Sequence, residues 1–454
     1  MPEKKSNSTV KDMTEGTIWK HLITFAFPLF VGNIFQQLYN TVDSVIVGNF
    51  VGADALGAVT STVPIVLTLI GTFVGMSMGA GVVISQYFGA KDIENLRKST
   101  HTATVATVIL SLIIAAIGYF STPFLLRMMN TPESVFKEAV VYLQIFSLGL
   151  GGLMLYNMGA AILRAVGDSR RPLYYLILAS ILNIFLDLLF VIKFEAGVAG
   201  VAYATILAQY ISSLAIFTRL FRSKECHSLT WREMKINFEI LKRIIKIGFP
   251  AGLQMALTSF SNVFVQSYIN AYGAAATAGW GIYVRVDAFV TLSTQSMSMA
   301  ITTFVGQNAG ARRPDRIRQG LWECKKISLS ISITLITILY LSAPFIASLF
   351  NRDAQVLHYG VLFLRLNTLF DPFNVLNQTH AGALRGVGDS RTPMLIMLFS
   401  FVMFRQIYLF VISKITSSVH FIAFGYPIGW IMCCILILLH IKRSGWEKKL
   451  GIRG

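Results

Sequence analysis

Long apolar runs recur along the whole chain and constrain its fold more than any other feature of the sequence. A membrane-spanning helix needs about 20 consecutive, mostly apolar residues, whereas a spanning strand needs about ten that alternate in polarity. The runs in this chain are continuous and long, which favours helices. We count twelve of them, at residues 18–48, 56–84, 99–122, 135–160, 172–192, 197–218, 244–271, 277–305, 327–350, 354–382, 393–413 and 419–440.

The composition leaves few alternatives to a membrane location. Of the 454 residues, 54% are hydrophobic and 13% are charged. A soluble globular protein carries roughly 25% charged residues. Its core could not hide this much apolar surface, because most residues of a folded chain border water. The composition therefore excludes a soluble enzyme, a disordered scaffold and a secreted module.

The net charge of +17 has a topological explanation. When the runs alternate in direction and the N-terminus is cytoplasmic, most of the 39 Lys and Arg residues fall in segments on the cytoplasmic side. Short cytoplasmic loops of membrane proteins carry such an excess. We therefore expect a multi-pass protein of the plasma membrane with both termini in the cytoplasm. The charge then gives no reason to expect nucleic acid as a partner.

An internal repeat divides the chain into two halves. Residues 163–172 read LRAVGDSRRP and residues 384–393 read LRGVGDSRTP, which differ at two positions. This repeat indicates a duplicated six-helix unit, and because six is even, both copies enter the membrane in the same direction. Parallel repeats of this kind are related by an axis along the membrane normal.

The predicted fold class is an all-α membrane protein with twelve transmembrane helices, arranged as two six-helix bundles related by a pseudo-two-fold axis along the membrane normal. Its predicted parts are an N-terminal lobe at 1–218, a cytoplasmic linker at 219–243, a C-terminal lobe at 244–441 and a basic cytoplasmic tail at 442–454.

Glycines have predicted structural roles in this fold. Gly167 and Gly388, in the repeated GDSR sequences, can adopt the positive φ that ends a helix. The aspartate after each of them can cap the next helix. Gly75 and Gly79 lie four residues apart, a spacing that lets helix backbones approach closely.

Two acidic residues lie within the apolar runs of the first half, Asp43 in the first run and Asp187 in the fifth. Ionisable groups at membrane depth are costly, so they indicate a functional site. Neither run carries a basic residue at comparable depth. Asn183 lies one helical turn before Asp187 and on the same face. An unpaired carboxylate can exchange protons, and carboxylate and amide oxygens together suit a small hard cation. The alternative is a pair of satisfied polar residues that pack helices together.

The second half carries charges of both signs at membrane depth, which are Arg285, Asp287, Arg365, Asp371 and Arg405. Such charges can pair with one another and need not titrate. A structural role and a polar cavity in the second lobe are therefore both open. At the repeat offset Asp187 aligns with Tyr408, so the two halves share a scaffold but not a site.

The chain resembles the multidrug and toxic compound extrusion (MATE) family over essentially its whole length. The resemblance rests on the two halves, on Pro28 in the first run, on the VGDSR turns and on the stretch QQLYNTVDSVIVGNFVGADALGAV at residues 36–59. It implies a pair of helical bundles that expels amphipathic, often cationic organic compounds by antiport with H⁺ or Na⁺. It also implies no enzymatic activity and no cofactor. We expect a monomer in the lipid bilayer whose partners are small organic substrates.

Within that family the chain is similar to the branch that includes the DNA-damage-inducible and archaeal members. The resemblance implies an ion-coupling cluster in the first lobe, with Pro28 as a hinge. Its positions fall on Tyr39, Asp43, Tyr142, Asn183, Asp187 and Thr205. Either a proton on the two acids or Na⁺ among Asp43, Asn183, Asp187 and Thr205 is compatible with these residue types.

Two other functions are open. A lipid-linked oligosaccharide flippase of the same superfamily would resemble this chain, but such proteins often have fourteen spans and a strongly cationic cavity. A membrane-embedded enzyme would need a catalytic constellation at membrane depth. The seven histidines are scattered and form no H-E-x-x-H pattern, so we expect neither an enzyme nor a metal centre.

Overall fold

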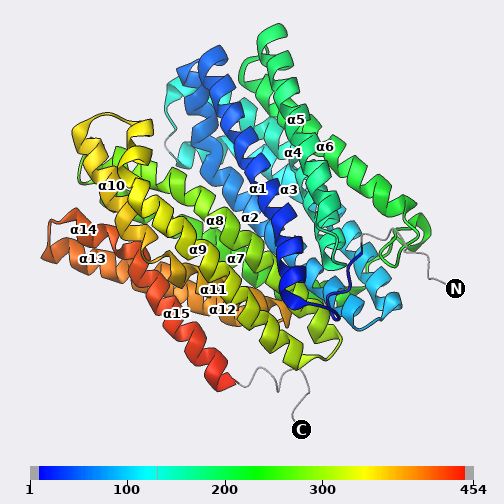
Figure 1. Cartoon of the computed structure of the whole chain (residues 1–454). Helices are drawn as coiled ribbons and strands as arrows, with labels where there is room; N and C mark the ends of the chain where they lie inside the picture. The colour runs from blue at the N-terminus through cyan, green and yellow to red at the C-terminus, as the bar shows by residue number, and fades with distance from the viewer. Residues whose placement is uncertain (1–9, 130, 445–454) are drawn as a thin grey trace. The chain divides into compact units, whose positions relative to one another are not determined.

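The computed structural model describes residues 10–129 and 131–444, and every regular element within them is helical (Figure 1). Each of the twelve predicted apolar runs coincides with helical structure. The first half contains α1 (Ile18–Ile46), η1 (Val47–Val51), α2 (Ala53–Gly89), α3 (Ile93–Met128), α4 (Glu133–Ala165), α5 (Arg170–Leu188), η2 (Leu189–Lys193) and α6 (Gly197–Arg222). The short turn η3 (Trp231–Glu233) precedes the second half. That half contains α7 (Phe238–Asn270), α8 (Ala274–Gly310), α9 (Pro314–Phe350), α10 (Ala354–Thr368), α11 (Asp371–Gly386), α12 (Arg391–Leu398), η4 (Phe399–Phe404), α13 (Arg405–Ile415), α14 (Val419–Ala423) and α15 (Gly425–Ser444).

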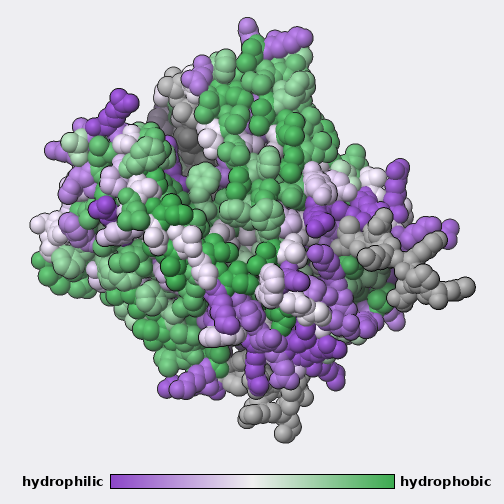
Figure 2. Space-filling model, viewed as in Figure 1, coloured by the Kyte–Doolittle hydropathy of each residue, from purple (hydrophilic) through white to green (hydrophobic). Residues whose placement is uncertain are grey.

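The surfaces of these helices fit a lipid environment. In the described residues, eight helical segments are long and apolar enough to cross a membrane. Large apolar side chains stay exposed along them, for example Phe120, Leu214 and Leu341. Contiguous exposed apolar surface on this scale marks contact with lipid or a partner. Figure 2 shows such surface over α5 and α6, with hydrophilic residues gathered toward the end of α6.

Two predicted spans are not continuous helices: the run at 419–440 forms α14 and α15, which are separated at Phe424, and the run at 354–382 is also divided. The apolar run at 354–382 forms α10 and α11, of 15 and 16 residues, with a turn between them. Pro372 lies in the first turn of α11. It has no backbone N–H for the carbonyl of Thr368, which is the residue where α10 ends, and its ring crowds that turn. The prediction of one helix here is wrong, and Asp371 begins a new helix instead of lying inside a long one.

Contacts between residues group the described chain into two compact units. Residues 10–12 and 27–252 form the first unit, and residues 13–26 and 253–444 form the second. The segment predicted as a linker and the beginning of α7 belong to the first unit. Helices α1 and α7 each pass from one unit to the other within a few residues of a proline, Pro28 in α1 and Pro250 in α7.

Each unit has its own hydrophobic core. In the first unit, Val83 of α2, Ile162 of α4 and Ile244 of α7 belong to one buried cluster. In the second unit, Trp280 of α8 and Phe363 of α10 belong to another. These cores hold the helices that carry the polar residues described below.

Backbone contact between α2 and the first half of α7 depends on glycine, as the four-residue spacing predicts. A Cβ atom added to Gly75 would lie 2.5 Å from the backbone nitrogen of Gly252, and one added to Gly79 would lie 2.5 Å from the carbonyl oxygen of Ile244. A larger residue at either position would push the two helices apart.

The two GDSR turns also follow the prediction. Gly167 has φ +86° and Gly388 has φ +92°, values that favour glycine. The Oδ1 atom of Asp168 accepts hydrogen bonds from two backbone N–H groups at the start of α5, and that of Asp389 accepts one at the start of α12. The repeated sequence therefore ends one helix and caps the next in both halves.

Candidate functional site

Two carboxyl groups, one fully buried and one partly buried, form the centre of a polar cluster in the first unit. Asp43 lies in the last turn of α1 and Asp187 in the last turn of α5, and the two groups are close enough to interact. Asp187 is fully buried. The Oδ1 atom of Asp43 and both carboxylate oxygens of Asp187 have no hydrogen-bond donor among the described residues. Two adjacent carboxylates without a cation repel each other, and binding of a proton or a cation removes that repulsion.

Polar residues from four helices surround the two acids. Tyr142 of α4 interacts with both carboxyl groups, and Tyr39 of α1 interacts with Asp43. Asn183, one turn before Asp187, donates from Nδ2 to the Oγ1 atom of Thr205 on α6, at 3.5 Å. The structure therefore brings the six sequence-predicted residues of the first half together in one place.

Two short π-helical segments adjoin the acids. The segment η1 begins four residues after Asp43, and η2 begins two residues after Asp187. The two segments contact each other. π-Helical turns inside α-helices are rare and frequently occur at functional sites. Here they shift the register of α1 and α5 just beyond the carboxyl groups.

Sequence reasoning missed Gln209 of α6. It is buried, it interacts with Tyr39, and its Oε1 atom has no donor among the described residues. Gln209 lies four residues after Thr205 and thus on the same helix face. That spacing was the available signal, but a neutral amide in an apolar run draws less attention than a carboxylate.

Three of the five second-half charges gather in the second unit. Asp287 of α8 and Asp371 of α11 interact with each other and with Tyr283, and Arg405 of α13 also interacts with Tyr283. Pairing of opposite charges was one of the possibilities that the sequence left open, and among the described residues of the second unit no ion pair joins these charges. Asp371 accepts a hydrogen bond from Ser332 at 2.9 Å.

Arg405 is satisfied by neutral partners. Its NH2 atom donates to the Oγ atom of Ser261 and to the Oδ1 atom of Asn262, both at 2.8 Å. Its guanidinium lies 4.9 Å from the ring centre of Tyr426, within the range of a cation–π contact. Arg405 therefore supports the helix packing around η4 without neutralising either acid.

The other two second-half charges do not join this group. Arg285 is exposed on α8. Arg365 of α10 donates from Nε to the carbonyl of Tyr340 on α9 at 3.3 Å, and its guanidinium lies 5.1 Å from the ring of Tyr340. Hydropathy indicates the depth of a residue but not the direction of its side chain, which explains why all five looked alike in the sequence.

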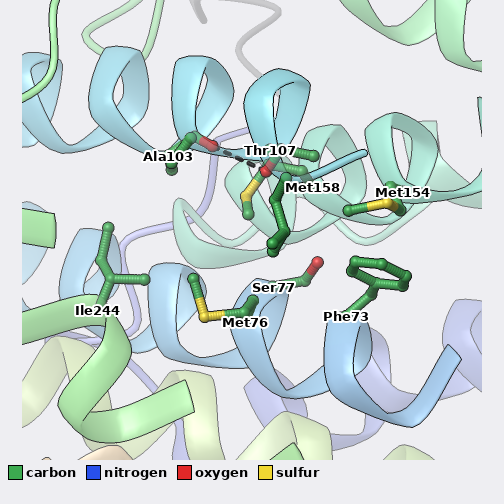
Figure 3. Close-up of a pocket in the computed structure, with 10 residues that line it drawn as sticks. Phe73, Met76, Ser77, Ala103, Thr107, Met154, Met158 and Ile244 are labelled. Atoms are coloured by element: carbon green, nitrogen blue, oxygen red, sulfur yellow. Dashed lines mark hydrogen bonds between the residues drawn. The ribbon is translucent and has the colours of Figure 1, made fainter. Parts of the chain in front are cut away.

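A small cavity lies inside the first unit among α2, α3, α4 and α7 (Figure 3). Phe73, Met76, Met154 and Met158 line it, and its volume is about 10 Å³. That is close to the smallest space that holds a water molecule. The cavity is too small for an organic substrate in this state, although flexible methionine side chains can repack around a guest.

Comparison with known proteins decides the family. The MatE family model matches residues 28–189 and 250–411, one stretch in each half. The chain belongs to the MatE family. The paired match agrees with the internal repeat, since the two stretches begin at Pro28 and at Pro250.

Relatives of this MatE chain match it over most of their length. The "Probable multidrug resistance protein YpnP" of Bacillus subtilis is 31% identical over 394 residues, which cover 87% of this chain and 88% of that protein. The "Probable multidrug resistance protein YoeA" of the same organism is 30% identical over 451 residues, covering 95% of each. A solved outward-facing MATE family transporter of the MOP superfamily superposes with a TM-score of 0.91 at 24% identity, over 98% of this chain and 100% of that one. The last similarity shows the shared fold.

The family places the polar clusters in a multi-pass membrane transporter. A transporter moves its substrate by changing conformation, and a buried charge that gains or loses an ion can bias such a change. The acid pair of the first unit has the features of such a group.

Proposed function

We propose that this MatE chain is a secondary active multidrug exporter that antiports amphipathic or cationic organic compounds against H⁺, with Na⁺ as the alternative coupling ion. It has twelve spans in two six-helix bundles related by an axis along the membrane normal. It works as a monomer in the plasma membrane, with both termini in the cytoplasm. Within the family it belongs to the branch of the DNA-damage-inducible and archaeal members. The names of the B. subtilis relatives support export of drugs.

One observation supports the coupling role more than any other. Asp43, which is partly buried, and Asp187, which is fully buried, lie together on two different helices, and no described Lys, Arg or His pairs with them. Loss of a proton from this pair leaves two repelling carboxylates, and its binding removes the repulsion. The ion-bound and ion-free forms therefore favour different packings of α1 against α5, which is the differential interaction that coupling requires.

Pro28 is the position at which α1 can bend when the acid pair gains or loses an ion. A proline inside a helix has no backbone N–H to donate to the preceding turn, and its ring crowds that turn. Kinks in helices occur at such positions. Asp43 lies on the part of α1 that follows Pro28 and belongs to the first unit, so we assign Pro28 as the hinge of this movement.

Na⁺ would use the same cluster differently. It would take oxygen ligands from Asp43, Asn183, Asp187 and Thr205, which suit a hard cation. A Na⁺-coupled transporter would therefore need the hydroxyl of Thr205, whereas a H⁺-coupled one would not.

The flippase alternative is not favoured. The matched relatives are named for multidrug resistance. In the second unit only Arg405 of the three predicted basic residues lies in the buried cluster, and it is held by Ser261 and Asn262.

Efflux of a fluorescent organic cation from proteoliposomes tests the proposal. A pH gradient is imposed without sodium, and wild type is compared with Asp187→Asn. Glu138→Gln, which removes an exposed acid of α4 in the same unit, is the matched control. We expect gradient-driven efflux in wild type and Glu138→Gln and none above background in Asp187→Asn. Equal efflux in Asp187→Asn would overturn the role of the acid pair. Efflux only after sodium is added would assign Na⁺ to it.

A further inference from the structure

The segment between α6 and α7 is tied at two points to the first turns of α3. The backbone N–H of Thr230 donates to the Nε2 atom of His101 at 3.0 Å, and that of Asn237 donates to the Oγ1 atom of Thr102 at 3.0 Å. Residues 231–236 bridge these two points. Between this bridge and α3 the first unit has a pocket of about 600 Å³. Ligand pockets typically measure about 300–1,000 Å³.

The pocket has an excess of positive charge. It is lined by four basic and two acidic side chains, which are Arg97, Lys98, Arg232, Lys235, Glu94 and Glu233. Lys98 pairs with Glu94, and the NH2 atom of Arg97 lies 3.4 Å from a carboxylate oxygen of Glu233. Within the described chain, Arg232 and Lys235 form no ion pair. The buried Nε atom of Arg97 also has no acceptor there. The pocket therefore offers unused positive charge and an unused donor.

Exposed aromatic residues flank the pocket. Trp231 is 78% exposed and stacks on Phe221 with a ring-centre distance of 4.4 Å, and Phe238 is 78% exposed. Both adjoin the pocket in sequence, at the level where α7 begins. Tryptophan and basic residues gather where a membrane protein meets the lipid headgroups. The pocket mouth is therefore expected at headgroup depth, where lipid phosphates are present at high local concentration.

We propose that this pocket binds the phosphate-bearing headgroup of an anionic phospholipid. Arg232 and Lys235 contact the phosphate, and Arg97 donates from Nε to one of its oxygens. Arginine suits phosphate because its planar group donates several hydrogen bonds in a fixed geometry. Basic pockets at the surface of membrane proteins bind anionic headgroups in this way. The site lies apart from the acid pair and does not depend on which compound the protein exports.

The test uses the full chain in a zwitterionic detergent and counts bound lipid by native mass spectrometry. Phosphatidylglycerol is titrated against phosphatidylcholine, and inorganic phosphate is tested as a competitor. Arg232→Gln/Lys235→Gln removes the two free charges. Arg222→Gln/Lys224→Gln removes two exposed charges of the same membrane face that do not line the pocket, and is the control. Thermal unfolding without added lipid shows whether each variant is folded.

We expect one tight phosphatidylglycerol per wild-type protein and per control. The pocket variant should bind it about tenfold or more weakly, since each basic residue near an anionic headgroup contributes about 1 kcal/mol. Equal weakening in the control would overturn the proposal, because general charge would then explain the binding. Competition by millimolar inorganic phosphate would overturn the lipid assignment in favour of a free phosphate site. The assay measures no transport, so a failure of the export proposal would not affect its result.

Discussion

At the scale of single residues, the two acids of the cluster could be predicted from the sequence, but the residues around them could be predicted only in part. Asp43 and Asp187 stand out because charges are rare in apolar runs. The resemblance to the MATE family then added Tyr39 and Tyr142, which periodicity alone does not mark. Gln209 was missed because a neutral amide within an apolar run is less conspicuous than a charged side chain. The sequence left open whether the second-half charges pair with one another, because it does not show that Arg405 reaches Ser261 and Asn262.

Substitution of Thr205 by valine separates the two coupling ions. Valine has nearly the same shape but no hydroxyl, so the variant loses two neutral hydrogen bonds: the one donated by Asn183 and the one that Thr205 donates to the carbonyl of Val201, each worth about 0.5–1.5 kcal/mol. With H⁺ coupling, we expect proton-driven efflux within about threefold of wild type in proteoliposomes. Thr205→Ser, which keeps the hydroxyl, is the control. A loss of transport in Thr205→Val that Thr205→Ser restores would contradict H⁺ coupling and indicate an oxygen ligand for Na⁺.

At the scale of helices, hydropathy located the apolar helices but not their internal breaks. The division between α10 and α11 follows from Pro372, which was readable, although the apolar run conceals it. The segments η1, η2 and η4 were not readable, because a π-helical turn depends on how neighbouring helices pack. All three lie near a charged residue that is buried or partly buried. These residues are Asp43 for η1, Asp187 for η2 and Arg405 for η4. The spacing of the glycines predicted a close approach of another helix to α2, but it did not show that this helix is α7.

Substitution of Gly79 by alanine tests that packing. The new Cβ atom would lie 2.5 Å from the carbonyl oxygen of Ile244, so α2 and α7 must separate, and overpacking of this kind destabilises by about 1–3 kcal/mol. We expect a lower Tm in detergent. Gly57→Ala, also on α2, is the control, because its Cβ would meet only Val135 at 3.5 Å. Equal changes in Tm for the two variants would show that the close approach does not limit stability.

The segment between α6 and α7 should loosen in acid. His227 is fully buried there, and burial lowers its pKa, although the carboxylate of Glu225, 3.4 Å from Nε2, opposes this shift. The other charged groups near it are Arg171, Asp168 and Arg219. The undocked segment binds the proton more readily than the docked one. Docking is therefore fully stable above pH ~6.5, the ordinary pKa of histidine, and weakens as the pH falls below it.

Hydrogen exchange at residues 225–237 measures this effect, with rates corrected for the intrinsic dependence of exchange on pH. Protection should fall between pH 7.5 and pH 5.5 in wild type and stay constant in His227→Gln, which keeps a polar side chain that cannot be protonated. The same loss of protection in both proteins would exclude His227 as its cause.

At the scale of the whole molecule, the sequence predicted the duplication, and the family match in each half supports it. It did not predict how contacts divide the chain. The beginning of α1 groups with the second unit, and the linker with the beginning of α7 groups with the first. Hydropathy and charge show where a chain leaves the lipid, whereas the grouping of helices depends on side-chain packing. Both helices that pass between units contain a proline near the crossing, which fits our assignment of Pro28 as a hinge.

Proton coupling is tested most directly when a gradient of the substrate, instead of a gradient of pH, drives transport. Proteoliposomes receive a gradient of the organic cation with no pH gradient, and a pH-sensitive dye reports the lumen. Antiport predicts that wild type drives protons against the direction of the substrate, and that Asp187→Asn moves none. An equal change of lumenal pH in Asp187→Asn, or substrate movement in wild type without any proton movement in sodium-free buffer, would contradict the claim that the acid pair couples protons to export.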